Sequence, residues 1–456
     1  MYRGDYMFLG REKELKMLSD YYNSSTFEFG VIHGRRRVGK TTLLKESIKG
    51  RKSLYLLAQQ ANAKTNLDLF SKRYGELLGV GQISYDSFRD FFEAIFKEDQ
   101  LIVILDEFSY LTEVDASIES VLQGLIDTYK EMTSIKFIIS GSEIGMFNNH
   151  FSVSKPLFNR QTFSYHLKEC DYLESSLYYS KFNPEDKIRA YAVFGGLPYY
   201  LSQIDDDLSI EENIKRLITN ENARFSNEVN MLLHTELRSI QEYQSVLQAI
   251  HSGSTKLSEI DSKSRIQNTA KTSKYVKKLM ELEIIEKEYK FLENPNSKNH
   301  LYRIKNNFIA FHYHFVWKNQ AARVLMSSDD FYDTFIKGDL EQFVSLRFEK
   351  IAEQYLIRKY KSRNHEPIMN IGRYWYNDRK TKTDVEIDLC VQTEKHIHIY
   401  ECKWTNSIIG ESIMNQLIEK GTYLDANKYG AFSKNGYHDL ILDKGYDLVT
   451  LEDLFK

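Results

Sequence analysis

Short apolar runs alternate with amphipathic stretches through the first third of the chain. The apolar runs predict strands, and the stretches between them, whose apolar residues recur at helical spacing, predict helices. The predicted strands are 29–32, 53–58, 101–105, 136–142 and 163–167, and the predicted helices are 66–78, 87–96 and 118–129. This alternation predicts a parallel sheet with helices on both faces, in which ligands bind at the carboxyl ends of the strands.

After the last of these strands the pattern changes. Residues 168–235 are predicted to form helices, interrupted by two glycines and Pro198, a combination that ends one helix and starts the next. From Leu237, three short helices are followed by two strands, which is the order of a winged helix-turn-helix. Near the end of the chain, alternating apolar and polar residues predict two more strands, at 384–391 and 396–404.

The loop after the first predicted strand carries the clearest chemical signal. Gly34, Gly39, Lys40 and Thr41 fit the phosphate-binding pattern G-x-x-x-x-G-K-[ST], and a helical pattern follows. Strand, loop and helix in this order direct main-chain N–H groups at an anion. Lys40 is expected to reach the β- and γ-phosphates and Thr41 to hold Mg²⁺, with Thr42 also counted among the nucleotide-binding residues.

The strand at 101–105 supplies the matching acidic pair, Asp106 and Glu107. An aspartate at the tip of such a strand can hold Mg²⁺, and the glutamate after it can orient and deprotonate the attacking water. An acidic turn after a core strand is the alternative interpretation. Together the two motifs predict an ATPase that uses ATP and Mg²⁺.

Two further residues are candidates for contact with the γ-phosphate. Ser140 lies at the tip of the fourth predicted strand, where Ser142 is an equally placed rival, and either is also an ordinary strand-end serine. Arg160 precedes the last strand and could neutralise transition-state charge in its own subunit or in a neighbouring one, which would require a homo-oligomer. A solvated loop arginine is the alternative for Arg160.

The segments "FLGREKELKML", "GRRRVGKTTLL", "ILDEF", "FIISGS" and "PLFNR" together resemble the AAA+-type ATPase family best known from archaea and also present in bacteria. That group is similar to the signal-transduction and Orc/Cdc6-like branches of the P-loop ATPases. The resemblance implies that Arg11, within Gly10-Arg11-Glu12, lines the nucleotide site and that Arg160 faces a phosphate. It also implies that Pro198 packs on the adenine ring.

Basic residues gather in the middle of the chain. Residues 256–278 contain seven Lys and Arg against Glu259 and Asp261. Lys271, Lys274 and Lys278 share one face of the third predicted helix of the winged helix-turn-helix, so contact with a DNA backbone is predicted there. A solvated lysine face on a packing module is the alternative.

A second cluster lies in the two C-terminal strands. Asp388 and Glu401, with Lys403 on the same side of its strand as Glu401, form the pattern D-x(12)-E-x-K. Two carboxylates suit Mg²⁺ in phosphodiester hydrolysis, and Lys403 could position the attacking water or offset developing charge. An amphipathic strand with a cross-strand Glu/Lys face is the alternative.

This cluster resembles the PD-(D/E)xK nuclease core. Together with "IGRYWY" and "ECKW", it also resembles a C-terminal domain of unknown function that is fused to archaeal-type ATPases. The resemblance covers about residues 335–456 and implies that Glu349, on a preceding helix, joins the metal site. The pairs His312/His314 and His396/His398 have no third ligand nearby and are interpreted as partly buried strand residues.

Composition limits the partners. Lys and Arg number 61 against 64 Asp and Glu, so any contact with nucleic acid must be local. The three cysteines form no C-x-x-C pair, and no apolar run reaches the roughly 18 residues of a membrane helix. With no signal peptide expected at the amino terminus, these features predict a reduced, cytoplasmic protein without a membrane partner.

The predicted fold class is α/β: a P-loop AAA+-type parallel sheet core with a helical lid, a winged helix and a C-terminal α/β restriction-endonuclease-like domain. The expected boundaries are 1–167, 168–235, 236–305 and 306–456. The leading hypothesis is an ATPase that couples its nucleotide state to the winged-helix and nuclease-like modules on DNA. One alternative is a nucleotide-dependent switch with an inactive C-terminal binding module, and another is a DNA-remodelling ATPase that does not cleave.

Overall fold

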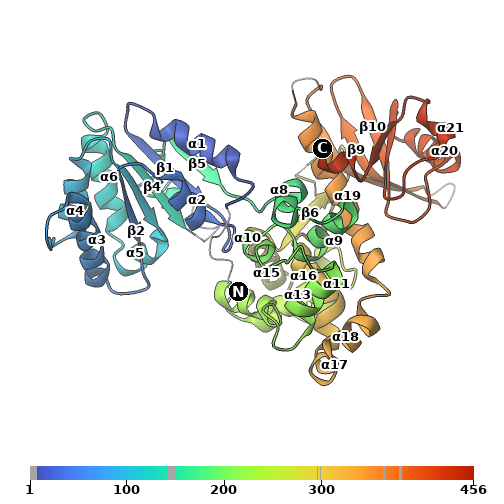
Figure 1. The fold of residues 1–456 in the computed structure, drawn as a ribbon, viewed down its shortest axis with the longest axis horizontal. Coiled ribbons are helices and arrows are strands. Elements are labelled where there is room, and N and C mark those ends of the chain that lie inside the picture. Colours follow the sequence, from blue (N-terminus) through green and yellow to red (C-terminus); the bar gives the residue numbers. More distant parts are fainter. Residues whose placement is uncertain (1–7, 142–149, 295, 298, 363–364, 379–382) are drawn as a thin grey trace. The chain divides into compact units, whose positions relative to one another are not determined.

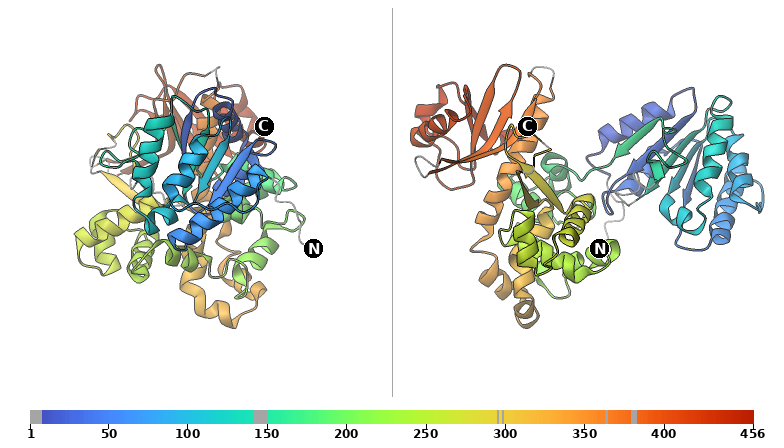
Figure 2. Two further views of the ribbon diagram at one scale, coloured as in Figure 1. Left: turned by 90° about the vertical axis from the view of Figure 1, so that its left-hand side faces the viewer. Right: turned by 180° about the vertical axis from the view of Figure 1, so that it is seen from behind.

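The computed structural model describes residues 8–141, 150–294, 296–297, 299–362, 365–378 and 383–456. The chain divides into two compact units (Figures 1 and 2). The first is Met1–Cys170 together with Leu197–Ser202, and the second is Asp171–Gly196 together with Gln203–Lys456. The short segment that contains Pro198 therefore belongs with the first unit, although the sequence around it belongs to the second.

A five-stranded sheet forms the centre of the first unit, with the strand order β2-β3-β4-β1-β5 and every neighbouring pair parallel. Each strand expected in this part of the chain is present, and the predicted mixed α/β class is confirmed. The strands are β1 (Glu28–His33), β2 (Ser53–Leu57), β3 (Ile102–Asp106), β4 (Lys136–Gly141) and β5 (Phe163–His166). The helices are α1 (Glu12–Tyr22), α2 (Lys40–Ser47), α3 (Ala63–Leu78), α4 (Phe88–Phe96), α5 (Phe108–Val114), α6 (Ile118–Tyr129) and α10 (Pro198–Leu201).

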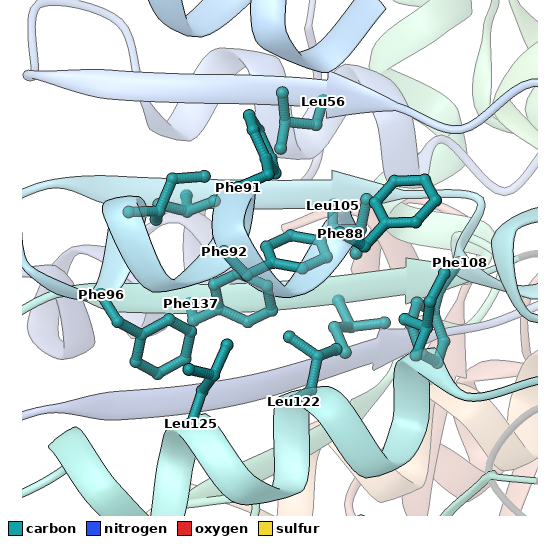
Figure 3. Packing of buried hydrophobic residues seen from close by; sticks show 14 of the residues in the cluster. Leu56, Phe88, Phe91, Phe92, Phe96, Leu105, Phe108, Leu122, Leu125 and Phe137 are labelled. Carbon is teal, nitrogen blue, oxygen red and sulfur yellow. The ribbon is translucent and has the colours of Figure 1, made fainter. Parts of the chain in front are cut away.

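One face of this sheet carries the apolar core of the unit. Side chains at alternate strand positions, such as Leu105 and Phe137, pack against aromatic residues of α4 and leucines of α6 (Figure 3). Helix α4 begins where the Ser87 side chain accepts a hydrogen bond from the Asp90 N–H, and its apolar residues then repeat at helical spacing. Each buried phenylalanine contributes roughly 1.5–3 kcal/mol, so this face accounts for much of the stability of the unit.

The opposite face of the sheet carries buried isoleucines, among them Ile104 and Ile138, together with polar residues near the carboxyl ends of the strands. Tyr55 lies opposite Ile104 and Ile104 opposite Ile138, so Asp106 and Ser140, two residues further along β3 and β4, lie on this face as well. Gly30 lies on the same face, where a Cβ atom would come within 2.1 Å of the Phe163 ring on β5. The absence of a side chain at Gly30 therefore lets the edge strand β5 pack closely on β1.

Helices make up most of the first part of the second unit. The three helices and the hairpin expected between 237 and 305 are present, and β6 pairs with β7 antiparallel, Ile285 opposite Ile304. The α-helices are α8 (Tyr172–Ser176), α9 (Pro184–Phe194), α11 (Ile210–Ile214), α12 (Glu228–Glu236), α13 (Ile240–His251), α14 (Leu257–Ser264), α15 (Thr269–Glu281), α16 (Asn307–Phe311), α17 (Gln320–Leu325), α18 (Ser328–Phe335) and α19 (Leu340–Tyr360). The hairpin strands are β6 (Ile285–Tyr289) and β7 (His300–Ile304).

A second five-stranded sheet closes the chain, with the order β12-β11-β10-β9-β8. Strand β9 pairs antiparallel with both β8 and β10, whereas β10, β11 and β12 are parallel. Helices α19 and α20 both pack against β9 and β10. The elements are β8 (Asn370–Asp378), β9 (Thr383–Gln392), β10 (Ile397–Lys403), α20 (Glu411–Gly421), β11 (Lys428–Ser433), α21 (Asp439–Leu442) and β12 (Asp447–Thr450).

The expectation that His312 and His314 are strand residues was wrong. Both lie in a helical segment, His312–Val316, that continues α16. The aromatic and β-branched residues around them favour a strand locally, but burial of Phe311, Tyr313 and Phe315 among neighbouring helices overrides that preference. Within the part of the chain that the structure describes, no helix combines the length and apolar character needed to cross a membrane.

His312 should make the stability of the second unit depend on pH. Burial, with a smaller effect of the nearby Arg323 charge, lowers the pKa of His312 from 6.5 to about 3. The folded state therefore resists protonation at a pH where the unfolded chain takes up the proton. The free energy of unfolding should fall by about 1 kcal/mol or more as the pH drops from 6.5 towards 4. Denaturant titration across this range should show a weaker dependence in His312→Gln, with His234→Gln at an exposed position of α12 as the control; an unchanged dependence would contradict this.

Candidate functional site

The P-loop connects the end of β1 to the start of α2. Gly39 precedes the helix with φ at 93°, a conformation that favours glycine, and Arg37 is also left-handed, with φ at 69°. At Gly34 a Cβ atom would lie 2.4 Å from the carbonyl oxygen of Leu167, which follows β5. The loop is thus shaped by its own backbone and by close contact with the chain beyond the neighbouring strand.

Lys40 lies back over this loop. Its Nζ donates hydrogen bonds to the carbonyl oxygens of Gly34 (2.8 Å) and Arg35 (3.2 Å), and the side chain is buried. A phosphate in the loop would compete with these carbonyls for the ammonium group, and as a full anion it would bind the group more strongly. Thr42, which directly follows the motif, lies in the first turn of α2.

The carboxylate of Asp106, at the end of β3, is fully buried and accepts hydrogen bonds from four donors. Thr41 Oγ1 and Tyr55 Oη donate to Oδ2 over 2.7 and 2.5 Å. Ser140 Oγ and the Glu107 N–H, the latter over 3.0 Å, donate to Oδ1. Three of the residues predicted from sequence, Thr41, Asp106 and Ser140, are therefore brought together, and Tyr55 joins them without having been predicted.

Glu107 occupies a strained position. Its φ is 57°, in the left-handed region, at the residue that precedes α5. A non-glycine residue in that conformation costs of order 1–3 kcal/mol, and such costs persist mainly where the surroundings hold the backbone for function. Its main-chain N–H donates to Asp106 Oδ1, so the backbone at Glu107 also helps to hold the neighbouring carboxylate.

Arg11 connects three segments of the first unit. Its guanidinium donates to the Lys168 carbonyl (2.7 Å), to the Val38 carbonyl of the P-loop (3.3 Å) and to Glu14 (3.4 Å). The side chain is buried. Arg11 therefore contacts the backbone of the phosphate-binding loop, at the edge of the predicted site.

Pro198 lies beside the P-loop although the two are distant in sequence. A Cβ atom at Gly39 would lie 3.8 Å from Pro198 Cγ, and the Arg37 guanidinium stands 4.4 Å from the centre of the Tyr199 ring. The neighbouring arginines have other partners: Arg36 donates to the Tyr110 hydroxyl (2.9 Å), and Arg35 lies 3.8 Å from Glu169. The family resemblance had implied that Pro198 lies at the nucleotide site. No sequence motif pointed to the contacts of the three arginines, because each joins segments whose proximity depends on the fold.

Arg160 lies at the amino-terminal end of the sheet strands, away from the end that carries the P-loop. Its guanidinium pairs with both carboxylate oxygens of Asp127, over 3.0 and 2.8 Å. Arg160 precedes the amino end of β5, whereas the P-loop follows the carboxyl end of β1. Because β1 and β5 are parallel, these two ends lie on opposite sides of the sheet along the strand direction. The alternative in which Arg160 reaches the phosphate within its own chain is therefore not supported by this arrangement. Ser142, the rival of Ser140, lies outside the described residues.

In the C-terminal sheet, β9 and β10 pair antiparallel with Leu389 opposite Tyr400, so that the next step of the register faces Asp388 towards Glu401. Asp388 accepts a hydrogen bond from the Cys402 N–H (2.8 Å). Glu401, which is buried, accepts from Lys403 (2.5 Å) and from Lys420 of α20 (3.2 Å). The hairpin that the sequence predicted does bring the two acids and Lys403 together.

Burial and the negative charge of neighbouring acids raise the pKa values of Asp388 and Glu349 in this cluster. Burial, reinforced by the charge of Glu401, raises the pKa of Asp388 to about 6. Burial likewise raises the pKa of Glu349, on α19, to about 7, and the Arg373 guanidinium, 3.1 Å away, opposes the rise. Carboxyl groups that hold protons near neutral pH are ones at which a divalent cation can replace the proton.

Two of the predicted features have more ordinary surroundings. Lys271 lies 3.4 Å from Glu242 and Lys278 lies 3.7 Å from Glu281, so part of the basic face of α15 is paired within the chain. Among the described residues, the three acids whose oxygens all lie within 4.8 Å of one another are Asp205, Asp206 and Asp207. Glu349, Asp388 and Glu401 do not form so tight a group.

Comparison with known proteins identifies the family. Residues 8–204 match the model of an ATPase domain found predominantly in Archaea, and residues 312–416 match a family of archaeal and bacterial proteins of unknown function. An uncharacterized protein of Methanocaldococcus jannaschii is 31% identical over 403 residues, which span 87% of this chain and 88% of the relative. The chain belongs to this archaeal-type ATPase family. The predicted ATPase, nucleotide binding and C-terminal domain of unknown function are thereby confirmed.

Two other matches agree with this assignment. An uncharacterized ATP-binding protein of the same organism is 39% identical over 49 residues, 11% of this chain and 83% of the relative. A Walker-type ATPase of Pyrococcus abyssi superimposes with a TM-score of 0.50 at 16% identity, covering 67% of this chain and 96% of that chain. At this low identity the structural match bears on the fold alone, and it supports the P-loop ATPase core.

Gly34→Ala should disturb this archaeal-type ATPase at its phosphate-binding loop. The new Cβ would collide with the Leu167 carbonyl, so the loop or the end of β5 must move. We expect nucleotide affinity to fall by roughly ten-fold or more, measured by titration with a fluorescent ATP analogue. Gly124→Ala is the matched control, because a Cβ atom at that position on α6 meets nothing within 4 Å. Equal affinity in the two variants would contradict the assigned loop geometry.

Proposed function

We propose that this ATPase hydrolyses Mg²⁺-bound ATP at the P-loop and couples its nucleotide state to a nuclease-like C-terminal module that acts on DNA. The observation that carries the first part is the buried Asp106 carboxylate, which Thr41 of the P-loop helix and Ser140 of β4 both contact. Those contacts bring the two halves of an ATPase site to the carboxyl edge of one sheet.

The residues at this edge suit Mg²⁺. A threonine hydroxyl and an aspartate carboxylate are oxygen ligands of the kind that Mg²⁺ binds beside nucleotide phosphates, so Thr41 and Asp106 would hold the ion. Bound there, Mg²⁺ would offset the charge of the phosphates. Lys40 would contact the β- and γ-phosphates, and the main chain from Gly34 to Thr42 would surround them.

Around the phosphates, other residues have supporting roles. Glu107 would orient the attacking water and accept its proton. Arg11 would hold the P-loop backbone in place through Val38, and Pro198 would contact the adenine. Ser140 would act through Asp106. Arg160, at the far edge of the sheet, would reach a phosphate only in a neighbouring subunit, so its proposed role implies a homo-oligomer.

For the C-terminal domain we propose a metal-dependent nuclease site of the PD-(D/E)xK kind. Asp388 and Glu401 would hold Mg²⁺, with Glu349 as a third acid, and carboxylate oxygens are the ligands this ion prefers. The raised pKa values of Asp388 and Glu349 support a site at which a cation displaces protons. Lys403 would position the attacking water or offset charge on the phosphodiester.

DNA would be held partly by the three-helix and hairpin module, proposed here to be a winged helix. Lys274 on α15 is exposed, and Lys271 and Lys278 lie on the same helix. Contacts from lysines to phosphates supply salt-dependent affinity without base readout. Their partners Glu242 and Glu281 are partly exposed surface acids, and phosphates would compete with them for the lysines.

One observation favours the second candidate, a nucleotide-dependent switch with an inactive C-terminal binding module. Glu401 is already neutralised by Lys403 and Lys420, and Glu349 pairs with Arg373. An acidic cluster balanced by its own cations is stable without a metal ion. On this alternative, the domain would recognise a partner and would be indifferent to Mg²⁺.

Substitutions in the P-loop and after β3 should separate binding from turnover. Lys40→Ala should abolish ATP hydrolysis, because the other cations of the motif, Arg35, Arg36 and Arg37, contact Glu169, Tyr110 and Tyr199 and do not occupy the position of the ammonium group. Glu107→Gln should still bind ATP but lose roughly 10²–10⁴-fold in kcat, since an amide cannot accept the proton of the water. Phosphate release and nucleotide binding measure the two effects. Lys49→Ala, at an exposed lysine just past α2, is the control; wild-type turnover in Lys40→Ala would refute the site.

Asp388→Ala tests the C-terminal proposal. Supercoiled plasmid incubated with Mg²⁺ or Mn²⁺, with and without ATP, should be cut by the wild type and left intact by this variant. Asp384→Ala, an exposed aspartate on the same strand, should cut normally. Loss of cutting in Asp388→Ala alone supports the nuclease, whereas no cutting by the wild type under any of these conditions favours the switch.

A further inference from the structure

Among the described residues, Tyr55 is the one side chain on the Asp106 carboxylate that the sequence did not assign to the nucleotide site. Its Oη lies 2.5 Å from Asp106 Oδ2, closer than Thr41 Oγ1 at 2.7 Å. We propose that Tyr55 is a positioning residue of the ATPase: its hydroxyl holds the Asp106 carboxylate so that Thr41 is free to turn towards the metal–nucleotide complex. This inference rests on the proposed assignment of Asp106 to the Mg²⁺–ATP site.

The position of Tyr55 follows from the order of the strands. β2 lies beside β3, with Leu57 opposite Asp106. Tyr55 is two residues before Leu57 and therefore lies on the same face of the sheet as Asp106. A phenol ring is long enough to bridge that step, and its hydroxyl reaches the carboxylate. On its other side the ring meets α2, where Lys45 Nζ stands 5.0 Å from the ring centre. Tyr55 is thus held between the sheet and the P-loop helix.

Each carboxylate oxygen of Asp106 accepts two hydrogen bonds, but from different kinds of donor. Oδ1 is held by Ser140 and by the Glu107 N–H, whereas Oδ2 is held only by the hydroxyls of Thr41 and Tyr55 among the described residues. If Tyr55 were absent, Thr41 would be the sole donor to Oδ2. Because a buried carboxylate oxygen without a donor is costly, Thr41 would then be retained at Asp106 and would bind the metal less well.

Tyr55 is also suited to remain a donor. A tyrosine hydroxyl ordinarily loses its proton only at about pH 10. The hydroxyl therefore keeps its proton throughout the neutral range, and it can only donate to the ionised carboxylate. A donor fixed in this way orients Asp106 without competing for a proton of the reaction.

Tyr55→Phe removes the hydroxyl and keeps the ring. We expect kcat to fall by about ten-fold, since a hydrogen bond to a charged group is lost. The Mg²⁺ concentration that gives half-maximal turnover should rise, while ATP-analogue binding without Mg²⁺ stays close to wild type and the Tm of the nucleotide-free protein falls no further than in the control variant. Tyr74→Phe is the matched control, because Tyr74 on α3 is a buried tyrosine that also donates to a carboxylate, Glu98, at 2.9 Å.

Two results would overturn the inference. One is an unchanged kcat and Mg²⁺ requirement in Tyr55→Phe. The other is a parallel loss of Tm and of Mg²⁺-free binding, which would show that Tyr55 only supports the fold. Asp106→Asn distinguishes failure of the proposed ATPase site from failure of the role inferred for Tyr55. If Asp106→Asn abolishes turnover while Tyr55→Phe changes nothing, the inference alone fails. If Asp106→Asn turns over normally, the proposed site and the inference both fail.

Discussion

The exclusion of water from the Asp106 carboxylate is the constraint on which the nucleotide-binding unit depends. A buried carboxylate is tolerated only when hydrogen-bond donors replace the water that it has lost. Here the donors come from the P-loop helix (Thr41), from β2 (Tyr55) and from β4 (Ser140), in addition to the adjacent main chain. The hydrogen-bonding needs of the Asp106 carboxylate are therefore met only when the strands of the sheet have the observed order. This requirement links the stability of the core to the geometry of the site.

The acids of the second unit are satisfied in a different way. Glu349 and Asp388 have raised pKa values because of burial, and Glu401 is surrounded by cations of the protein instead of neutral donors. Neutral hydroxyls fix the orientation of a carboxylate without neutralising its negative charge. Lysines and an arginine, by contrast, balance charge that a divalent cation could also balance. This difference is why the first site is assigned to a defined reaction and the second supports two candidate functions.

Three consecutive arginines give the P-loop its particular environment. Arg35, Arg36 and Arg37 occupy the variable positions of the motif, and each has a different partner, respectively Glu169 beyond β5, Tyr110 of α5 and Tyr199 of α10. The loop is therefore connected to segments on several sides. A change in loop conformation on nucleotide binding would alter the contacts of the loop with α5, directly after Glu107, and with the segment that contains Pro198.

Much of this protein was determined by local sequence. The alternating apolar runs predicted the strands of the first sheet and β9 and β10 of the second, but not β8, β11 or β12. The spacing from Gly34 to Thr41 and the pair Asp106-Glu107 identified the ATPase, because these features depend on residues close together in the chain. The same holds for the β9–β10 hairpin that faces Asp388 towards Glu401. Only the tertiary structure decided that Tyr55 meets Asp106, that Arg373 meets Glu349 and that Arg160 lies far from the P-loop of its own chain. Each of these depends on which strands and helices become neighbours, and strand order is set by packing of the whole unit, which no local pattern encodes.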